Sequence, residues 1–207
     1  MFQSIQHSRL FLPRGNPNEG RRKRKIDDQG CEKPTKIHGR AWVILGSDGR
    51  PVHNIDTDMI YHNAHLAVTD VKLMGPFAFG NLKRWEDFPR KARPGDLVIV
   101  GKNFGAGSSR QQAVDCFAAL RIGAILAESA GAIYYRNAIN SGFPMLMCPG
   151  ICSGGEVKDG DELEADFATG EVTNLTTGKA IAGGKPFPKV QMDIYQAGSL
   201  FAYGKQA

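Results

Sequence analysis

Apolar strand-like runs alternate with helix-like segments through the middle of the chain. Residues 97–100 form a continuous β-branched run typical of a buried strand, and residues 111–120 follow with apolar positions at helical spacing. The alternation continues with strands expected over 124–127 and 145–148 and a helix over 131–140. Because strands that alternate with helices are usually parallel and covered by those helices, this pattern predicts an α/β fold.

The flanks of this region have a different pattern. A strand over 41–45, ended by a Gly-Ser-Asp-Gly turn at 46–49, is predicted near the start of the folded part. Beyond Pro149, short polar segments predict a small β-rich part and then a terminal helix near 192–197. The helix over 111–120 is expected to bury Ala113, Val114, Phe117, Ala118 and Leu120.

The positive charge is confined to one end of the chain. Residues 1–36 hold nine Lys or Arg and four Asp or Glu, a balance of +5, which equals the net charge of the whole chain. We therefore expect a basic, disordered extension over 1–36 and one neutral domain over 37–207. An organelle presequence, a nucleic-acid patch at 21–25 and an extension without function all remain open for this segment. No apolar stretch approaches the roughly 20 residues of a membrane span, and a cytoplasmic protein is the expectation.

The chemistry-bearing segment of the sequence is the hexapeptide Gly-Ala-Gly-Ser-Ser-Arg at 105–110, placed between a predicted strand and a predicted helix. Such a loop offers hydroxyl groups, a guanidinium and unpaired N–H groups near the positive end of a helix. A phosphate cradle or a plain tight turn is the alternative interpretation. A Walker-type loop would need a Lys beside its Ser or Thr, whereas Arg110 follows the serines here, so nucleotide binding is disfavoured.

Two carboxylates, Asp56 and Asp58, stand in the polar segment 54–60. In a strand they would share one face, and turn or cap duty is the plainer alternative for each of them. Calcium binding is weakly supported, since the glycine and the later glutamate of an EF-hand loop are missing. His62 and His65 are minor candidates, because a loop histidine usually has no catalytic duty.

The four cysteines, at 31, 116, 148 and 152, have no Cys-x-x-Cys spacing. Neither a zinc site nor a complete iron–sulfur site is supported, and buried reduced thiols are expected. We therefore assign no metal or cofactor to this chain.

Three separated segments, at 54–58, 101–110 and 134–142, resemble one family in their order and residues: Asn-Ile-Asp-Thr-Asp, Gly-Lys-Asn-Phe-Gly-Ala-Gly-Ser-Ser-Arg and Tyr-Tyr-Arg-Asn-Ala-Ile-Asn-Ser-Gly. The chain is similar, over about residues 37–200, to the small subunit of 3-isopropylmalate dehydratase, the swivelling domain of the aconitase superfamily. The resemblance implies a three-layer β/β/α domain that closes over a larger partner subunit. It also implies that the partner carries a [4Fe–4S] cluster, whose open iron binds the hydroxyl and a carboxylate of a hydroxy-diacid, and that the active site is shared.

The resemblance also implies roles for individual residues. Ser108 is the base that removes the proton beside a carboxylate, and Arg110 binds the carboxylate and stabilises the alkoxide. Asp58 supports the proton-handling network, and Ser109 and Gly107 contact the substrate. Without the flanking motifs, Ser108 would be interpreted as a helix N-cap. Structural roles are expected for Arg136 and Asn137, on a helix that faces the loop.

In this family, the loop after the Asp-Thr-Asp motif helps to select the substrate. Homoaconitase-like members resemble Tyr-Leu-Arg-Thr where this chain has His65 followed by Leu66, Ala67 and Val68. Because burying a carboxylate without a cation is costly, an alkyl-substituted malate is expected rather than homocitrate. The expected activity is that of a hydro-lyase small subunit acting on a 3-isopropylmalate-like substrate.

Other interpretations stay open at this point. Citramalate or 2,3-dimethylmalate is an alternative substrate, because Ala64 and His65 depart from the Arg and Tyr common in relatives. A nucleic-acid-binding protein is the alternative from another class, although the neutral domain argues against it. A non-catalytic scaffold subunit is the third.

Overall fold

The computed structural model describes residues 32–181 and 183–206. The predicted basic extension therefore falls, except for residues 32–36, outside the described residues, as does Cys31. The strands are β1 Lys36–Val43, β2 Leu97–Val100, β3 Ala124–Ala127, β4 Met145–Met147, β5 Glu162–Asp166, β6 Val172–Asn174 and β7 Lys179–Ile181. The helices are α1 Thr57–Ile60, α2 Phe88–Lys91, α3 Gln112–Ala119, α4 Ala132–Asn140, α5 Lys189–Ala197 and α6 Leu200–Gly204, with 3₁₀ turns η1 Asn63–His65, η2 Val71–Leu73 and η3 Gly75–Phe77.

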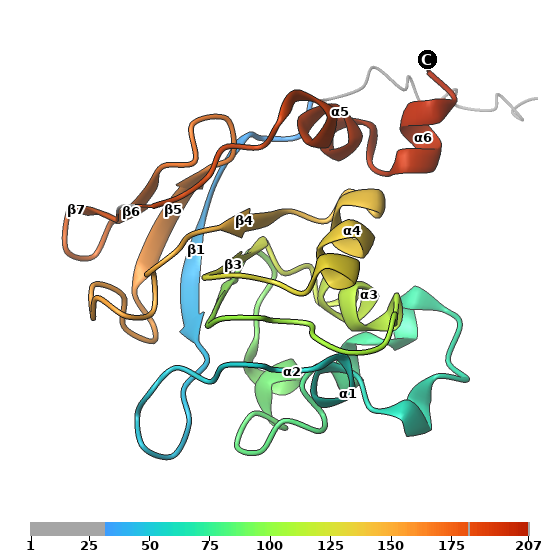
Figure 1. The fold of residues 1–207 in the computed structure, drawn as a ribbon, viewed down its shortest axis with the longest axis horizontal. Helices are drawn as coiled ribbons and strands as arrows, with labels where there is room; N and C mark the ends of the chain where they lie inside the picture. Colours follow the sequence, from blue (N-terminus) through green and yellow to red (C-terminus); the bar gives the residue numbers. More distant parts are fainter. Residues whose placement is uncertain (1–31, 182, 207) are drawn as a thin grey trace, which may run out of the picture. The chain divides into compact units, whose positions relative to one another are not determined.

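The seven strands form one sheet with the order β4-β3-β2-β1-β5-β6-β7. Strands β1 to β4 are parallel to one another, whereas β5, β6 and β7 are joined in antiparallel pairs. The parallel half carries α3 and α4 on one side, and the antiparallel strands lie on the other (Figure 1).

Strand β1 joins the two halves and is longer than its apolar run. Its first part, residues 36–40, pairs antiparallel with β5, and Ala41–Val43 pair parallel with β2. The predicted strand over 41–45 was wrong at both ends. It begins earlier, because residues 36–40 pair with β5 although every second side chain there is polar and lies on an open face. It ends at Val43, and Leu45 forms only an isolated bridge to Pro51 across the 46–49 turn.

Two hydrophobic cores lie on opposite faces of the parallel half. Because side chains alternate along a strand, Val98 and Val100 face the helices, whereas Leu97 and Ile99 pack towards the antiparallel strands. The second core is completed by antiparallel-strand residues such as Leu163. Helices, parallel sheet and antiparallel sheet thus form three layers, and the predicted β/β/α fold is confirmed.

The predicted strands β2 and β3 match the structure at both ends, and the helices α3 and α4 begin one residue later than predicted. Helix α3 buries Ala113, Val114 and Phe117 as expected, but its fourth buried residue is Cys116, and Ala118 is exposed. At Ala118 the apolar side chain is small enough to leave in water at little cost.

The folded part begins earlier than the predicted boundary at residue 37. The Lys33 N–H donates to Gln196 Oε1 at 2.7 Å, and the Pro34 carbonyl accepts from the Tyr195 hydroxyl at 2.8 Å. Residues 33–36 therefore belong with the domain rather than with the extension. Across the described residues, no helix has both the length and the apolar character needed to cross a membrane.

Candidate functional site

The glycine-rich loop after β2 is fixed on both sides by main-chain hydrogen bonds. Gly105 donates to the Ile55 carbonyl at 2.7 Å, and Gly131 donates to the Phe104 carbonyl at 2.8 Å. A Cβ atom at Gly105 would lie 2.1 Å from Tyr134 Cγ, and the φ of this residue is +72°. Only glycine fits there, so this position of the motif is set by the close approach of the loop to α4.

The next residues of the loop are tied to α1. The Thr57 N–H donates to the Ala106 carbonyl at 2.9 Å, and the Thr57 hydroxyl donates to the Ser108 carbonyl at 2.9 Å. Thr57 is itself buried. The middle residue of the Asp-Thr-Asp motif therefore holds the main chain that carries the serines.

The Ser108 side chain is exposed and free of structural duty. The N-cap of α3 is Gln111, so Ser108 precedes the helix by four residues and is not its cap. Within the described part of the chain, the Ser108 hydroxyl makes no hydrogen bond, and the N–H groups of Gly107, Ser108 and Ser109 donate none. The alternative interpretation of Ser108 as a helix N-cap is therefore wrong, because Arg110 and Gln111 separate both serines from the helix.

Arg110 and Asp58 form an ion pair next to these serines. Arg110 Nη1 lies 2.6 Å from Asp58 Oδ1 and 3.2 Å from the Tyr61 carbonyl oxygen. Its side chain is 15% exposed, and that of Asp58 is 34% exposed. The bond from Arg110, supported by the Asn63 N–H, holds the pKa of Asp58 below its usual value of 3.8, so the carboxylate is ionised at neutral pH.

The two carboxylates of the Asp-Thr-Asp motif have different roles. The segment is a short helix rather than a strand, so they do not share a face as strand residues would. Asp56 is the N-cap of α1, and its Oδ1 accepts from the Met59 N–H at 2.8 Å. The role of helix cap is therefore confirmed for Asp56. Asp58, in the first turn of α1, instead forms the ion pair with Arg110.

Helix α4 organises the far side of the loop. Asn137 Nδ2 lies 3.4 Å from Ser109 Oγ, and Gln111 Nε2 donates to Ser141 Oγ at 2.9 Å. The expected structural role of Asn137 therefore has a contact behind it. Arg136 is exposed and, over residues 32–181 and 183–206, makes no ion pair or hydrogen bond.

The predicted selectivity residues follow η1. Leu66 and Ala67 are exposed and Val68 is half-buried, so they form an open apolar edge rather than an enclosed pocket. The segment is anchored just before this edge, where the Tyr61 hydroxyl donates to the His65 carbonyl at 3.2 Å and the His65 ring stacks on Phe77 at 4.0 Å. His65 thus has a packing role, and His62 accepts from the Ala64 N–H at 3.1 Å as the cap of η1.

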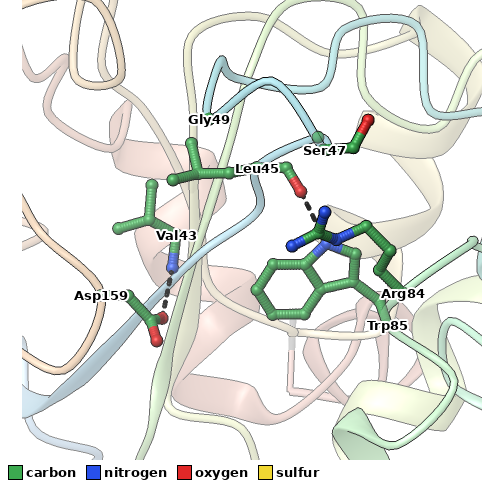
Figure 2. A pocket seen from close by; sticks show the side chains of 8 residues that line it. Val43, Leu45, Ser47, Gly49, Arg84, Trp85 and Asp159 are labelled. Atoms are coloured by element: carbon green, nitrogen blue, oxygen red, sulfur yellow. Dashed lines mark hydrogen bonds between the residues drawn. The ribbon is translucent and has the colours of Figure 1, made fainter.

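A hollow of about 380 Å³ lies away from these groups, at the end of β1 (Figure 2). The Trp85 indole N–H donates to the Leu45 carbonyl and Asp159 accepts from the Val43 N–H, each at 3.1 Å. Its lining residues are Val43, Leu45, Gly46, Ser47, Gly49, Arg84, Trp85 and Asp159. None of the predicted site residues lines this hollow, so we do not assign the reaction to it.

The three cysteines of the described chain are free thiols, buried or half-buried. Burial raises the pKa of Cys148 and of Cys152 to about 12, and Cys116 is fully buried with a raised pKa. Among the described residues, no group of three or more His, Cys, Asp or Glu is placed to hold a metal ion.

Sequence reasoning missed one residue of this site, Asn81. Its Nδ2 donates to Asp58 Oδ2 at 3.1 Å, from a segment with no periodic pattern and no motif. Only the fold brings it to Asp58, and no signal in the single sequence identifies it.

Comparison with known proteins places these residues in a family. The Aconitase C-terminal domain family matches residues 54–148. The isopropylmalate/citramalate isomerase small subunit of Methanocaldococcus jannaschii is 41% identical over 170 residues, covering 82% of this chain and 94% of that protein. The 3-isopropylmalate dehydratase small subunit of Pyrobaculum aerophilum is 42% identical over 172 residues, covering 83% and 99%.

A solved structure shows the same fold. The crystal structure of a 3-isopropylmalate dehydratase protein from Methanocaldococcus jannaschii matches with a TM-score of 0.71 and 32% sequence identity, covering 83% of this chain and 94% of that one. The motif segments of this chain are joined by hydrogen bonds around the loop after β2, and the chain belongs to the family of 3-isopropylmalate dehydratase small subunits, in the aconitase superfamily.

Proposed function

We propose that this chain is the small subunit of a hydro-lyase that isomerises or dehydrates a branched 2-hydroxy diacid of the 3-isopropylmalate type. One observation carries the proposal: a free serine hydroxyl, Ser108, lies on a fixed loop two residues from an arginine that an aspartate orients. Relatives that match nearly their whole length to this chain bear that activity in their names.

Ser108 is the proposed base. Loss of water across a carbon–carbon bond begins with removal of a weakly acidic proton beside a carboxylate, and a serine alkoxide can take that proton only if its charge is stabilised. The Arg110 guanidinium offers that stabilisation. So do the N–H groups of Gly107, Ser108 and Ser109, which donate no hydrogen bond among the described residues. We therefore assign proton removal to Ser108 and substrate contact to Ser109 and Gly107.

Arg110 is the proposed carboxylate-binding group. Asp58 and the Tyr61 carbonyl engage Nη1, while Nε and Nη2 make no hydrogen bond within the described part of the chain. A guanidinium with one corner anchored can present its other N–H groups to a carboxylate as a fork. Asp58 thus orients Arg110, and its carboxylate is ionised at neutral pH.

An alkyl-substituted malate is the proposed substrate, selected by the edge at Leu66, Ala67 and Val68. This edge offers apolar surface and no cation for an additional carboxylate. Citramalate and 2,3-dimethylmalate remain alternatives to 3-isopropylmalate, and one similar protein is named for isopropylmalate and citramalate together.

The proposed partner is a large subunit that carries a [4Fe–4S] cluster. Small-subunit relatives imply a large-subunit partner, and among the described residues of this chain no group of three or more His, Cys, Asp or Glu is placed to hold a metal ion. Such a cluster would supply the Lewis acid for the departing hydroxyl. The exposed edge at Leu66 and Ala67 fits closure of the site by a second chain, and we propose a cytoplasmic complex.

The test is hydro-lyase activity of the reconstituted complex. The chain is mixed anaerobically with the large subunit of the same organism and assayed on 3-isopropylmalate, citramalate, 2,3-dimethylmalate and homocitrate. Turnover of an alkyl-malate is expected. A complex that forms with an intact cluster and turns over none of the four would favour a scaffold or nucleic-acid-binding role instead.

A further inference from the structure

Among the described residues, the Asn81 side chain is hydrogen-bonded to Asp58 alone. Its Nδ2 lies 3.1 Å from Asp58 Oδ2 and 3.4 Å from the Asp58 main-chain oxygen. The other carboxylate oxygen, Oδ1, accepts from Arg110 Nη1 at 2.6 Å and from the Asn63 N–H at 3.1 Å. Within the described residues, Asn81 is therefore the donor that holds Oδ2.

The turn that carries Asn81 is held in an unfavourable backbone conformation. Phe79 is fully buried and has a φ of +57°, where a bulky side chain is rarely found. Its ring packs against Phe88 and Phe117 at centroid distances of 5.2 and 5.1 Å, and its N–H donates to the Ile60 carbonyl at 2.8 Å. Such a conformation persists only where the surroundings fix it, and it is concentrated at functional sites.

This arrangement ties the turn to the same short helix that carries Asp58. The bond from Phe79 to Ile60 fixes the turn against the end of α1, and the Asn81 amide then reaches back to the first turn of that helix. A carboxylate held at one oxygen can still rotate about its last torsion, whereas one held at both oxygens has a fixed plane. Because the Arg110 guanidinium is paired with that carboxylate, its direction is fixed as well.

We propose that Asn81 is a positioning residue for the reaction, acting through Asp58 to hold the Arg110 guanidinium in the direction from which it receives the substrate carboxylate. This inference rests on the proposed function. Asn81 itself is exposed and both of its hydrogen bonds go to Asp58, so its side chain has no packing duty of its own in the described fold.

The first test compares Asn81→Ala with Asn63→Ala in the reconstituted complex. The control is matched, because Asn63 contacts Asp58 through its main-chain N–H and its exposed side chain makes no hydrogen bond among the described residues. We expect Asn81→Ala to lower kcat/KM about tenfold, mainly through KM, since the guanidinium meets the carboxylate before the chemical step. A merely structural role would lower the active fraction, and so kcat, with KM unchanged.

The second test uses the isolated full chain and needs no activity. The pKa of the Asp58 carboxyl is followed by NMR in the wild type, Asn81→Asp and Asn63→Ala. Asn81→Asp keeps the shape of the side chain but places a carboxylate where a donor stood, so it should raise the Asp58 pKa, against the opposing effect of Arg110 and His62. Asn63→Ala should leave that pKa where it is.

The outcomes separate this inference from the proposed function. An inactive wild-type complex overturns the proposed function, and the inference that rests on it falls as well. An active wild type, with Asn81→Ala indistinguishable from Asn63→Ala in KM, overturns the inference alone. An Asp58 pKa that Asn81→Asp does not move would also contradict it.

Discussion

The loop proposed to carry the chemistry and the segment proposed to select the substrate are built in opposite ways. The loop at 105–110 is held by main-chain bonds to α1 and α4, and its Gly105 has no room for a side chain. The segment at 66–73 contains only one regular element, the 3₁₀ turn η2, and its Leu66, Val71 and Leu73 are exposed by 38, 41 and 60%. The chain alone thus fixes the groups proposed for the chemistry. The surface proposed to face the substrate's side group stays open to solvent.

The largest expected effect tests the fixed region. Ser108→Ala should lower the rate of the reconstituted complex by about a thousandfold or more, because it removes the hydroxyl proposed as the base. Its stability should not change, since the Ser108 hydroxyl makes no hydrogen bond in the described chain. Ser47→Ala, in the exposed 46–49 turn, is the control and should match the wild type in initial rate and melting temperature.

Gly105→Ala should break the fixed region by unfolding it. The added methyl group would meet Tyr134 and would force alanine into a φ of +72°, so we expect a loss of roughly 3 kcal/mol or more. Gly49→Ala is matched in φ, at +71°, but has no atom within 4 Å of the added Cβ. It should cost only about 1 kcal/mol, and equal losses in urea unfolding would contradict the packing argument.

Ala67→Arg should change the open region without harming the fixed one. A cation on the exposed edge should lower kcat/KM for an alkyl-malate about tenfold and raise it for homocitrate, with the free energy of unfolding unchanged. Thr69→Arg places the same charge two residues further along as a control. If both variants respond alike to the two substrates, the edge at 66–68 does not select the side group.

Asp58→Asn should have a small, pH-dependent effect on stability. The folded-state pKa of Asp58 lies below its unfolded value of 3.8, so its contribution is present above pH 3.8 and is lost as the pH falls through the folded-state pKa. Because the pair is partly exposed, we expect a difference of under about 1 kcal/mol at neutral pH. Urea unfolding of both proteins from pH 7 to pH 2 measures it, and a gap that widened in acid would contradict the assignment.

Removal of residues 1–31 should have the smallest effect on turnover. We propose that the basic extension is separate from catalysis, because residues 37–207 are charge-balanced and carry the motif residues. The deletion must stop before residue 33, since Lys33 and Pro34 bond to α5. Retained turnover with lost RNA binding in a filter assay would give the extension a function of its own, and lost turnover would contradict the proposal.

The sequence predicted best those elements that are buried on both faces. Strands β2 and β3 are continuous apolar runs and were located to the residue. The first half of β1 was missed because Lys36 to Arg40 alternate exposed and half-buried side chains, and only pairing with β5 makes them a strand. Helix α1 was missed because four residues carry no period, and its start depends on the Asp56 cap.

The same division holds for the candidate site. Ser108, Arg110 and Asp58 were singled out from motifs, and the structure brings Arg110 and Asp58 within 2.6 Å of each other. Asn81 was missed because its place depends on the buried Phe79 turn, which is a tertiary feature. Motifs identify groups that carry chemistry, whereas the groups that orient them depend on long-range packing.

The most direct test of the account is the initial rate on 3-isopropylmalate of the complex reconstituted with the proposed iron–sulfur large subunit, with wild-type chain and with Ser108→Ala. We predict turnover by the wild type and its loss in the variant, while both chains bind the large subunit equally and melt at the same temperature. A Ser108→Ala complex that turns over at the wild-type rate would contradict the central claim, because Ser108 would then not be the base.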